Sequence, residues 1–208
     1  MVPRLNRTLV LAVTCGPWLV ASSAGAAEPP RNGIGVAITY LAPSSPLEPG
    51  VGAALQYRRE VPRNWVLTAD LGFTQIDREA EGMALEGSVS LTQLALGALW
   101  RFTDGSWSLA AGGGIDWLAP DGDGDYVSGP STAVTNDYDV DAGLGVHAVF
   151  EASHAIGQSW RVFGRAGWLV AELDGTQRFV VDGVAGAPLD VTFDFAGPQL
   201  AIGAAWMF

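Results

Sequence analysis

The last ten residues, Gln199–Phe208, read QLAIGAAWMF and alternate between two kinds of side chain. One face carries Leu200, Ile202, Ala204, Trp206 and Phe208, and the other carries a glutamine, a methionine and small residues. A period of two predicts a β-strand whose faces lie in different environments. An exposed edge strand of a soluble protein that ended in Trp-Met-Phe would promote aggregation. The stretch therefore favours a strand whose aromatic face is covered by something other than water.

The first 27 residues have the layout of a secretory signal peptide. Two arginines precede an apolar run over Leu9–Val20, and small residues follow up to Ala27. We expect cleavage after Ala27, or else after Ala26, which leaves one mature domain over residues 28–208. Lipidation of Cys15 is disfavoured, because an apolar stretch still follows it. Since Cys15 is the only cysteine, the mature chain has no disulfide.

The composition excludes several classes of protein. The chain has 11 basic residues, all of them arginine, against 22 acidic ones, so the basic footprint that nucleic-acid binding requires is missing. The mature part has no run of the ~20 apolar residues that a membrane helix needs. A membrane protein without such a helix has one other option, a closed β-barrel.

Alternation predicts eight strands joined by connections of alternating length. Three turns are short (Val61–Arg63, Thr103–Ser106 and Ser153–Ser159), and four loops are longer and rich in Gly, Pro and acidic residues (Ala42–Pro49, Asp77–Glu86, Ala119–Asp137 and Asp174–Val191). The expected strands are Gly33–Leu41, Gly50–Glu60, Asn64–Ile76, Gly87–Phe102, Trp107–Leu118, Tyr138–Ala152, Trp160–Leu173 and Thr192–Phe208.

One face of each predicted strand is apolar or aromatic, as in Ile34, Val36, Ile38 and Tyr40 of the first, and Val140 is expected on the same face of the sixth. Aromatic residues gather at both ends of these faces, which is typical of a membrane slab. A soluble eight-stranded barrel would place its large apolar residues inside and its charges outside. The pattern therefore predicts an all-β fold, an eight-stranded antiparallel up-and-down transmembrane β-barrel.

Two places break this pattern. Val89 and Leu91 fall on the inward phase of the fourth strand, which suggests a bulge or a segment above the membrane. Phe193 and Phe195 fall inward in the eighth strand, unless a bulge at Gly197-Pro198 changes the phase.

The inward phase carries acids and arginines between small residues. Because buried charge is costly unless it is paired, we expect a salt-bridged interior without a continuous pore. The members of this expected plug are Arg58, Asp70, Arg101, Asp116, His147, Glu151, Arg161 and Arg165. A two-residue turn at Asp104-Gly105 would set Phe102 beside Trp107 and Gln93 beside Asp116. A turn centred on Ile156 would set Glu151 opposite Arg161 and His147 opposite Arg165.

Residues 28–208 as a whole resemble the small eight-stranded outer-membrane barrels grouped with the outer membrane protein A transmembrane domain and the opacity proteins. The resemblance rests on architecture, the signal peptide and the terminal Phe208. It implies insertion into the bacterial outer membrane by the barrel-assembly machinery, with Trp206 and Phe208 as the assembly signal. It carries no family-specific motif, so it bears on fold and location more than on activity.

Two short motifs compete with this interpretation. Outer-membrane enzymes that modify lipid A use a serine with a histidine, and Ser153-His154 offers both types, but it is expected in a short turn without an oxyanion site. Asp121, Asp123 and Asp125 have the spacing of a calcium loop, yet Tyr126 stands where that loop needs glycine. We expect neither a catalytic site nor a metal or other cofactor.

The leading functional hypothesis is a non-enzymatic envelope barrel whose acidic outer loops contact lipopolysaccharide, a host surface or another cell. Its other partners would be the outer-membrane lipids. The alternative is a narrow channel for small solutes or ions, and a lipid A-modifying enzyme is less favoured.

Overall fold

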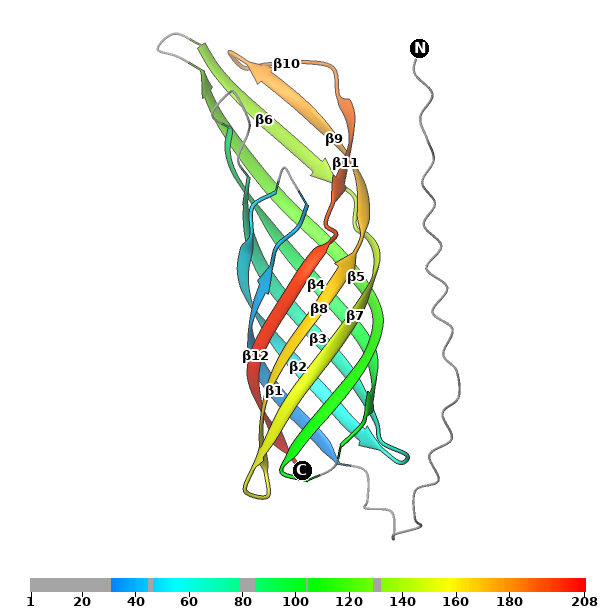
Figure 1. Ribbon diagram of the computed structural model, residues 1–208. Helices are drawn as coiled ribbons and strands as arrows, with labels where there is room; N and C mark the ends of the chain where they lie inside the picture. The colour runs from blue at the N-terminus through cyan, green and yellow to red at the C-terminus, as the bar shows by residue number, and fades with distance from the viewer. Residues whose placement is uncertain (1–30, 45–46, 79–84, 104, 129–131) are drawn as a thin grey trace, which may run out of the picture.

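The computed structural model describes residues 31–44, 47–78, 85–103, 105–128 and 132–208, and for residues 77–78, 85–87, 122–128 and 132–138 it describes the backbone. Within these residues, eight antiparallel strands close into a barrel (Figure 1), because β1 pairs with β12 and β5 pairs with β7. The barrel strands are β1 (Asn32–Leu41), β2 (Gly50–Val61), β3 (Trp65–Arg78), β4 (Leu85–Arg101), β5 (Trp107–Ser128), β7 (Gly143–Ile156), β8 (Trp160–Val170) and β12 (Gly197–Met207). This confirms the predicted fold class. None of the described residues forms a helix long and apolar enough to cross a membrane.

The barrel has a short-turn end and a long-loop end. At the short-turn end, few residues join β2 to β3, β4 to β5 and β7 to β8, and the chain finishes there (Figure 1). The β7–β8 turn contains Gly157 with φ 65°, a left-handed conformation that glycine adopts without strain. This turn is shorter than the expected Ser153–Ser159, because β7 continues to Ile156.

Four further strands rise beyond the barrel at the long-loop end (Figure 1). They are β6 (Thr132–Val140), β9 (Glu172–Val181), β10 (Val184–Ala185) and β11 (Leu189–Asp194). β6 pairs with the upper part of β5 and with β9, which in turn pairs with β10 and β11. We call these four strands the extension.

The extension corrects the expected loops at 119–137 and 174–191. Glycine and aspartate favour turns, but β5, β6 and β9 satisfy one another's backbone groups in a sheet. Three of the expected strands are divided as a result: β6 ends before β7, β8 ends before β9, and β11 ends before β12. Val140, expected outward, ends β6 and packs partly buried against the apolar interior.

The outer wall of the barrel is apolar, as the alternation predicted. Exposed large apolar side chains occur on every one of its eight strands, for example Val36, Leu55, Phe73, Leu96, Ile115, Leu144, Val170 and Ile202. At the short-turn end the aromatic rings touch one another. Trp65 meets Trp100 edge to face at 5.2 Å between ring centroids, and Trp206 stacks on Phe208 at 5.0 Å. An apolar wall with aromatic rims fits the hydrocarbon layer of a membrane.

Candidate functional site in the barrel interior and the extension

The centre of the interior is a chain of ion pairs built on four strands. Glu151 of β7 is buried and accepts hydrogen bonds from Arg58 Nη2 of β2 at 3.0 Å and from Arg165 Nε of β8 at 2.8 Å. Arg165 Nη1 also donates to Asp70 Oδ2 of β3 at 2.7 Å, and Gln56 Nε2 donates to the other oxygen of that carboxylate. Because each carboxylate meets a guanidinium, these charges can be held away from water.

A second group lies nearer the short turns. Glu60 lies 2.6 Å from Arg101 Nη2 and 3.5 Å from Arg161 Nη2. Arg161 Nη1 donates to Ser108 Oγ at 2.9 Å and to Ser153 Oγ at 3.1 Å, and the two hydroxyls lie 2.8 Å apart. Arg161 is therefore held mainly by hydroxyl groups and by one longer ion pair.

Asp116 and His147 form a third group near the middle of the barrel. The Asp116 carboxylate is fully buried, accepts a hydrogen bond from Gln93 Nε2 at 2.7 Å, and lies 2.7 Å from His147 Nδ1. Together, the three groups contain all eight residues expected in the interior.

The two predicted hairpin registers are wrong. Glu151 lies opposite Arg165 rather than Arg161, and His147 lies opposite Leu169. The turn occupies Gly157–Ser159 instead of centring on Ile156, and this shifts the pairing along the strands.

In the β4–β5 hairpin, Gln93 lies opposite Leu118, and the Phe102 N–H bonds the carbonyl oxygen of Leu109. The connection is longer than two residues, so Phe102 does not lie directly opposite Trp107. The predicted contact between Gln93 and Asp116 nevertheless exists, as a diagonal one.

An apolar layer closes the interior above these polar groups, towards the long loops. Its buried members are Leu41, Leu47, Ile76, Leu91, Leu118, Leu169, Ala171, Leu173, Phe193 and Phe195. Three of the residues that broke the predicted pattern, Leu91, Phe193 and Phe195, belong to this layer. Val89 is also buried, and both Val89 and Leu91 point inward without a bulge, because the β4–β5 register is continuous. The sequence pattern placed these residues on the inward phase but did not group them in one layer.

A cavity of about 90 Å³ lies inside the barrel beside the polar groups. Its lining includes Gln93, Asp116, His147 and Arg165, and also Leu41 of the apolar layer. This volume and this polar lining suit a small cluster of water molecules.

Ser153 and His154 do not form a joint site. They are consecutive residues within β7, so their side chains point to opposite faces of the wall. Ser153 lies inside beside Ser108, whereas the His154 ring lies outside against Trp107, at 4.5 Å between ring centroids.

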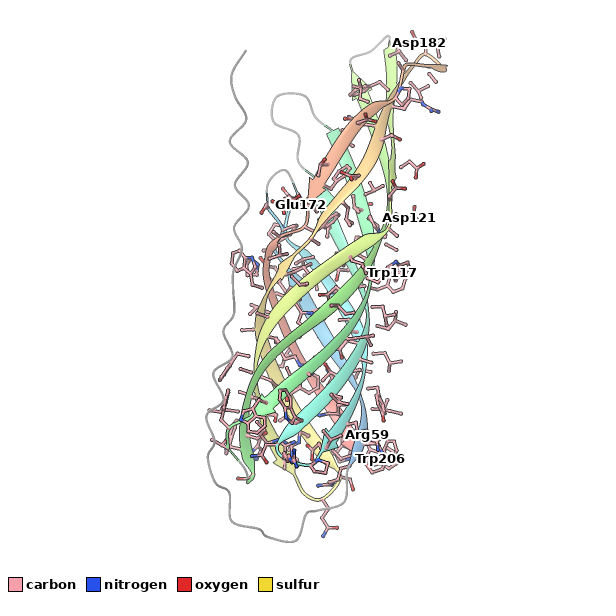
Figure 2. All side chains as sticks on the ribbon, turned by 90° about the vertical axis from the view of Figure 1, so that its right-hand side faces the viewer. Arg59, Trp117, Asp121, Glu172, Asp182 and Trp206 are labelled. Carbon is pink, nitrogen blue, oxygen red and sulfur yellow. The ribbon has the colours of Figure 1, made fainter. Side chains whose placement is uncertain are left out.

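The structure places Asp121 on β5, exposed, beyond the long-loop aromatic rim (Figure 2). The side chains of Asp123 and Asp125 lie outside the described residues. Among the residues that are described, no group of three His, Cys, Asp or Glu side chains is placed to hold a metal ion.

The outer face of the extension carries a set of carboxylates that the sequence did not predict as one surface, because only Asp174 and Asp190 were expected in a loop. On β9 and β11 the exposed positions alternate, so Glu172 and Asp174 share a face with Asp190 and Asp194. Glu172 lies directly opposite Asp194, and Asp174 accepts a hydrogen bond from Thr192 at 3.3 Å. We call this set, with the exposed Asp139 and Asp141 beside β9, the acidic face.

No protein-family model and no curated protein matches the chain. Solved structures do match. A major outer membrane protein of Thermus thermophilus aligns at a TM-score of 0.63 with 14% identity, over 87% of this chain and all of that one. The outer membrane protein AlkL in lipid bilayers aligns at 0.53 with 13% identity, over 90% and 94%. Neisserial surface protein A aligns at 0.51 with 11% identity, over 88% and 100%.

These matches and the apolar wall agree. The chain has the fold of the small eight-stranded barrels of the bacterial outer membrane, and the outer membrane is where this fold places it.

Proposed function

We propose that this protein is a non-enzymatic outer-membrane barrel that presents the extension at the cell surface for contact with a ligand. The long-loop end then faces the outside, and the short-turn end faces the periplasm. The observation that carries the proposal is the acidic face on a paired sheet above a filled interior. Function in such proteins tends to lie on the exposed connections, while the barrel serves as a rigid scaffold.

The arrangement of the carboxylates supports a binding role. Like charges placed directly opposite each other on neighbouring strands destabilise a sheet, and Glu172 faces Asp194 in this way. Asp139 and Asp190 lie on either side of Thr176 in the same row. Arg178 is the one described basic side chain of the extension. A face of this kind attracts cations, so it suits lipopolysaccharide bridged by divalent ions or a basic patch on another surface.

The test is neutralisation of the acidic face. The variant Asp139→Asn/Asp174→Asn/Asp190→Asn should lower the binding of proteoliposomes to immobilised lipopolysaccharide in the presence of Mg²⁺, and to host-cell monolayers. The matched control Asp121→Asn/Asp182→Asn neutralises two exposed acids away from this face. Equal binding by the two variants and the unmodified protein would refute a role for the acidic face.

The second candidate is a narrow channel, which the cavity inside the barrel favours. Planar-bilayer recording of the refolded protein separates the two functions. We expect no steady conductance, because the ion pairs and the apolar layer both obstruct the path. A steady unitary conductance that changes in Arg165→Ala would favour the channel instead.

A further inference from the structure

Arg59 lies on the outward face of the barrel wall, at the level of the aromatic rim. Among the described side chains, it is the one charged residue (Arg, Asp or Glu) on that face at or between the two aromatic rims. It follows Leu55 and Tyr57 in the outward phase of β2 and is exposed. It has no hydrogen-bond or ion-pair partner among the described residues. A guanidinium at the edge of a hydrocarbon layer requires an anion or water close by.

The neighbours of Arg59 form two rows across the wall at the short-turn end. In its own row, Asn32 of β1 lies opposite Arg59, and the Asn32 backbone exchanges hydrogen bonds of 2.9 and 2.8 Å with Phe208. In the next row, further into the membrane, lie Tyr57 and Trp206. Figure 2 shows Arg59 and Trp206 together at this end of the barrel.

The Tyr57 hydroxyl fixes the Asn32 side chain by donating to its Oδ1 at 2.9 Å. Among the described residues, the Nδ2 group of Asn32 has no acceptor, and it lies in the same row as the guanidinium. The site therefore offers hydrogen-bond donors on the water side and aromatic surface on the hydrocarbon side.

We propose that Arg59 and Asn32 bind the phosphate of a phospholipid whose acyl chains lie along Tyr57, Leu55 and Trp206. A guanidinium fork matches phosphate oxygens in two parallel hydrogen bonds, and aromatic rings settle at the level of the headgroups. This lipid belongs to the periplasmic leaflet, an assignment that rests on the orientation given under the proposed function.

Charge complementarity favours a phospholipid over a protein partner. Among the described residues, the charged side chains that are accessible at the short-turn end and do not point inward are basic: Arg31, Arg59 and Arg63. Arg31 is engaged with the Gln158 carbonyl oxygen, and the nearest acid of β2, Glu60, points inward to Arg101. The aromatic rim beside Arg59 also faces lipid along its whole length, which leaves a lipid as the molecule with access to both parts of the site.

Native mass spectrometry of the refolded protein in detergent tests the site and does not depend on membrane orientation. Phosphatidylglycerol should bind more tightly than a diacylglycerol with the same acyl chains. Arg59→Gln should weaken phosphatidylglycerol binding about tenfold and leave diacylglycerol unchanged, because one charge-assisted interaction is lost. The phosphatidylglycerol affinity of Arg59→Lys should lie between those of the unmodified protein and Arg59→Gln, since lysine keeps the charge but loses the forked guanidinium. The control is Arg178→Gln, which makes the same change at the other end.

Inorganic phosphate at the same concentration should not displace phosphatidylglycerol, because it lacks the contacts with Tyr57 and Trp206. Displacement would show a free-anion site and would overturn the lipid assignment. Unchanged binding in Arg59→Gln, or an equal loss in Arg178→Gln, would overturn the site itself. Heat-modifiable mobility on gels checks that each variant is folded. If the lipid site is refuted, the proposed role of the acidic face still stands, because the two lie at opposite ends of the barrel.

Discussion

Towards the short turns, the inward positions of β2, β7 and β8 carry Arg58, Glu151 and Arg165, whereas towards the long loops the inward positions of β5 and β8 carry Leu118 and Leu169. Both sets are buried, and both fill the same barrel. The polar set is stabilised by charge-assisted hydrogen bonds with short, defined geometry. The apolar set is stabilised by removal from water, with no directional requirement.

The difference shows how the two halves depend on each other. Lipid surrounds the outer wall, so that wall gains little from contact with other apolar groups, and the interior must supply much of the specific packing. The apolar layer keeps water away from the ion pairs below it, and a drier environment strengthens each pairing while making any unpaired charge more costly. A variant that removes a charge from the ion pairs, or a side chain from the apolar layer, therefore tests how much both sets contribute to stability.

The largest effect is expected when the shared carboxylate loses its charge. Glu151→Gln preserves the shape of the side chain but leaves Arg58 and Arg165 without their common partner. Loss of one member of a buried ion pair costs about 3–5 kcal/mol, and we expect that decrease in the free energy of unfolding in urea from lipid vesicles. The control is Glu172→Gln on the exposed extension, where the same change should shift stability by less than about 1 kcal/mol.

A double-mutant cycle sharpens this result. Arg165→Met should couple strongly with Glu151→Gln, because each substitution removes a partner of the other. Additive losses would contradict the pairing and, with it, the observed register of β7 and β8.

A somewhat smaller effect is expected in the apolar half. Leu118→Ala removes a fully buried side chain from the layer and should cost about 2–4 kcal/mol, since the surrounding side chains collapse only partly into the space. The matched control is Leu144→Ala on the outer wall, where Leu144 is 72% exposed and lipid fills the gap. Equal losses of unfolding free energy in the two variants would argue that the layer contributes no more than the lipid-facing wall.

Alternation was enough to predict the barrel. The outward residues from Ile34 to Phe208 obey a period of two, because only that period separates a lipid face from an inner face. The inward phase of the same alternation carries the eight polar residues that the structure places inside. Pairing partners could not be predicted in the same way, because the register of a hairpin depends on its turn, and both predicted turns proved longer or displaced.

The extension was missed for a related reason. The Gly-Asp repeat over residues 121–125 has the composition of a loop, and nothing local reveals that β9 will pair with β6 across some 40 residues of chain. The apolar layer, by contrast, had a usable signal. Leu91, Leu118, Leu169 and Phe195 are large apolar residues on the inward phase, and all lie near the long-loop ends of the strands expected from the sequence. This combination is a signal for a buried layer.

The smallest loss of unfolding free energy is expected for Arg161→Ala. This variant distinguishes the observed β7–β8 register from the register predicted from the sequence. If Glu151 depended on Arg161, then Arg161→Ala would be as damaging as Glu151→Gln. In the structure, Arg161 donates to Ser108 and Ser153, which keep their own 2.8 Å contact without it, and Glu60 keeps Arg101. We therefore expect Arg161→Ala to cost about 1–2 kcal/mol, the scale of one or two hydrogen bonds. Coupling between Arg161→Ala and Glu151→Gln should be much smaller than that of Arg165→Met in the same unfolding measurement, because Arg161 makes no hydrogen bond to Glu151. A coupling as large as that of Arg165 would mean that the β7–β8 turn is centred on Ile156, so this pair of cycles decides which arginine holds the buried carboxylate.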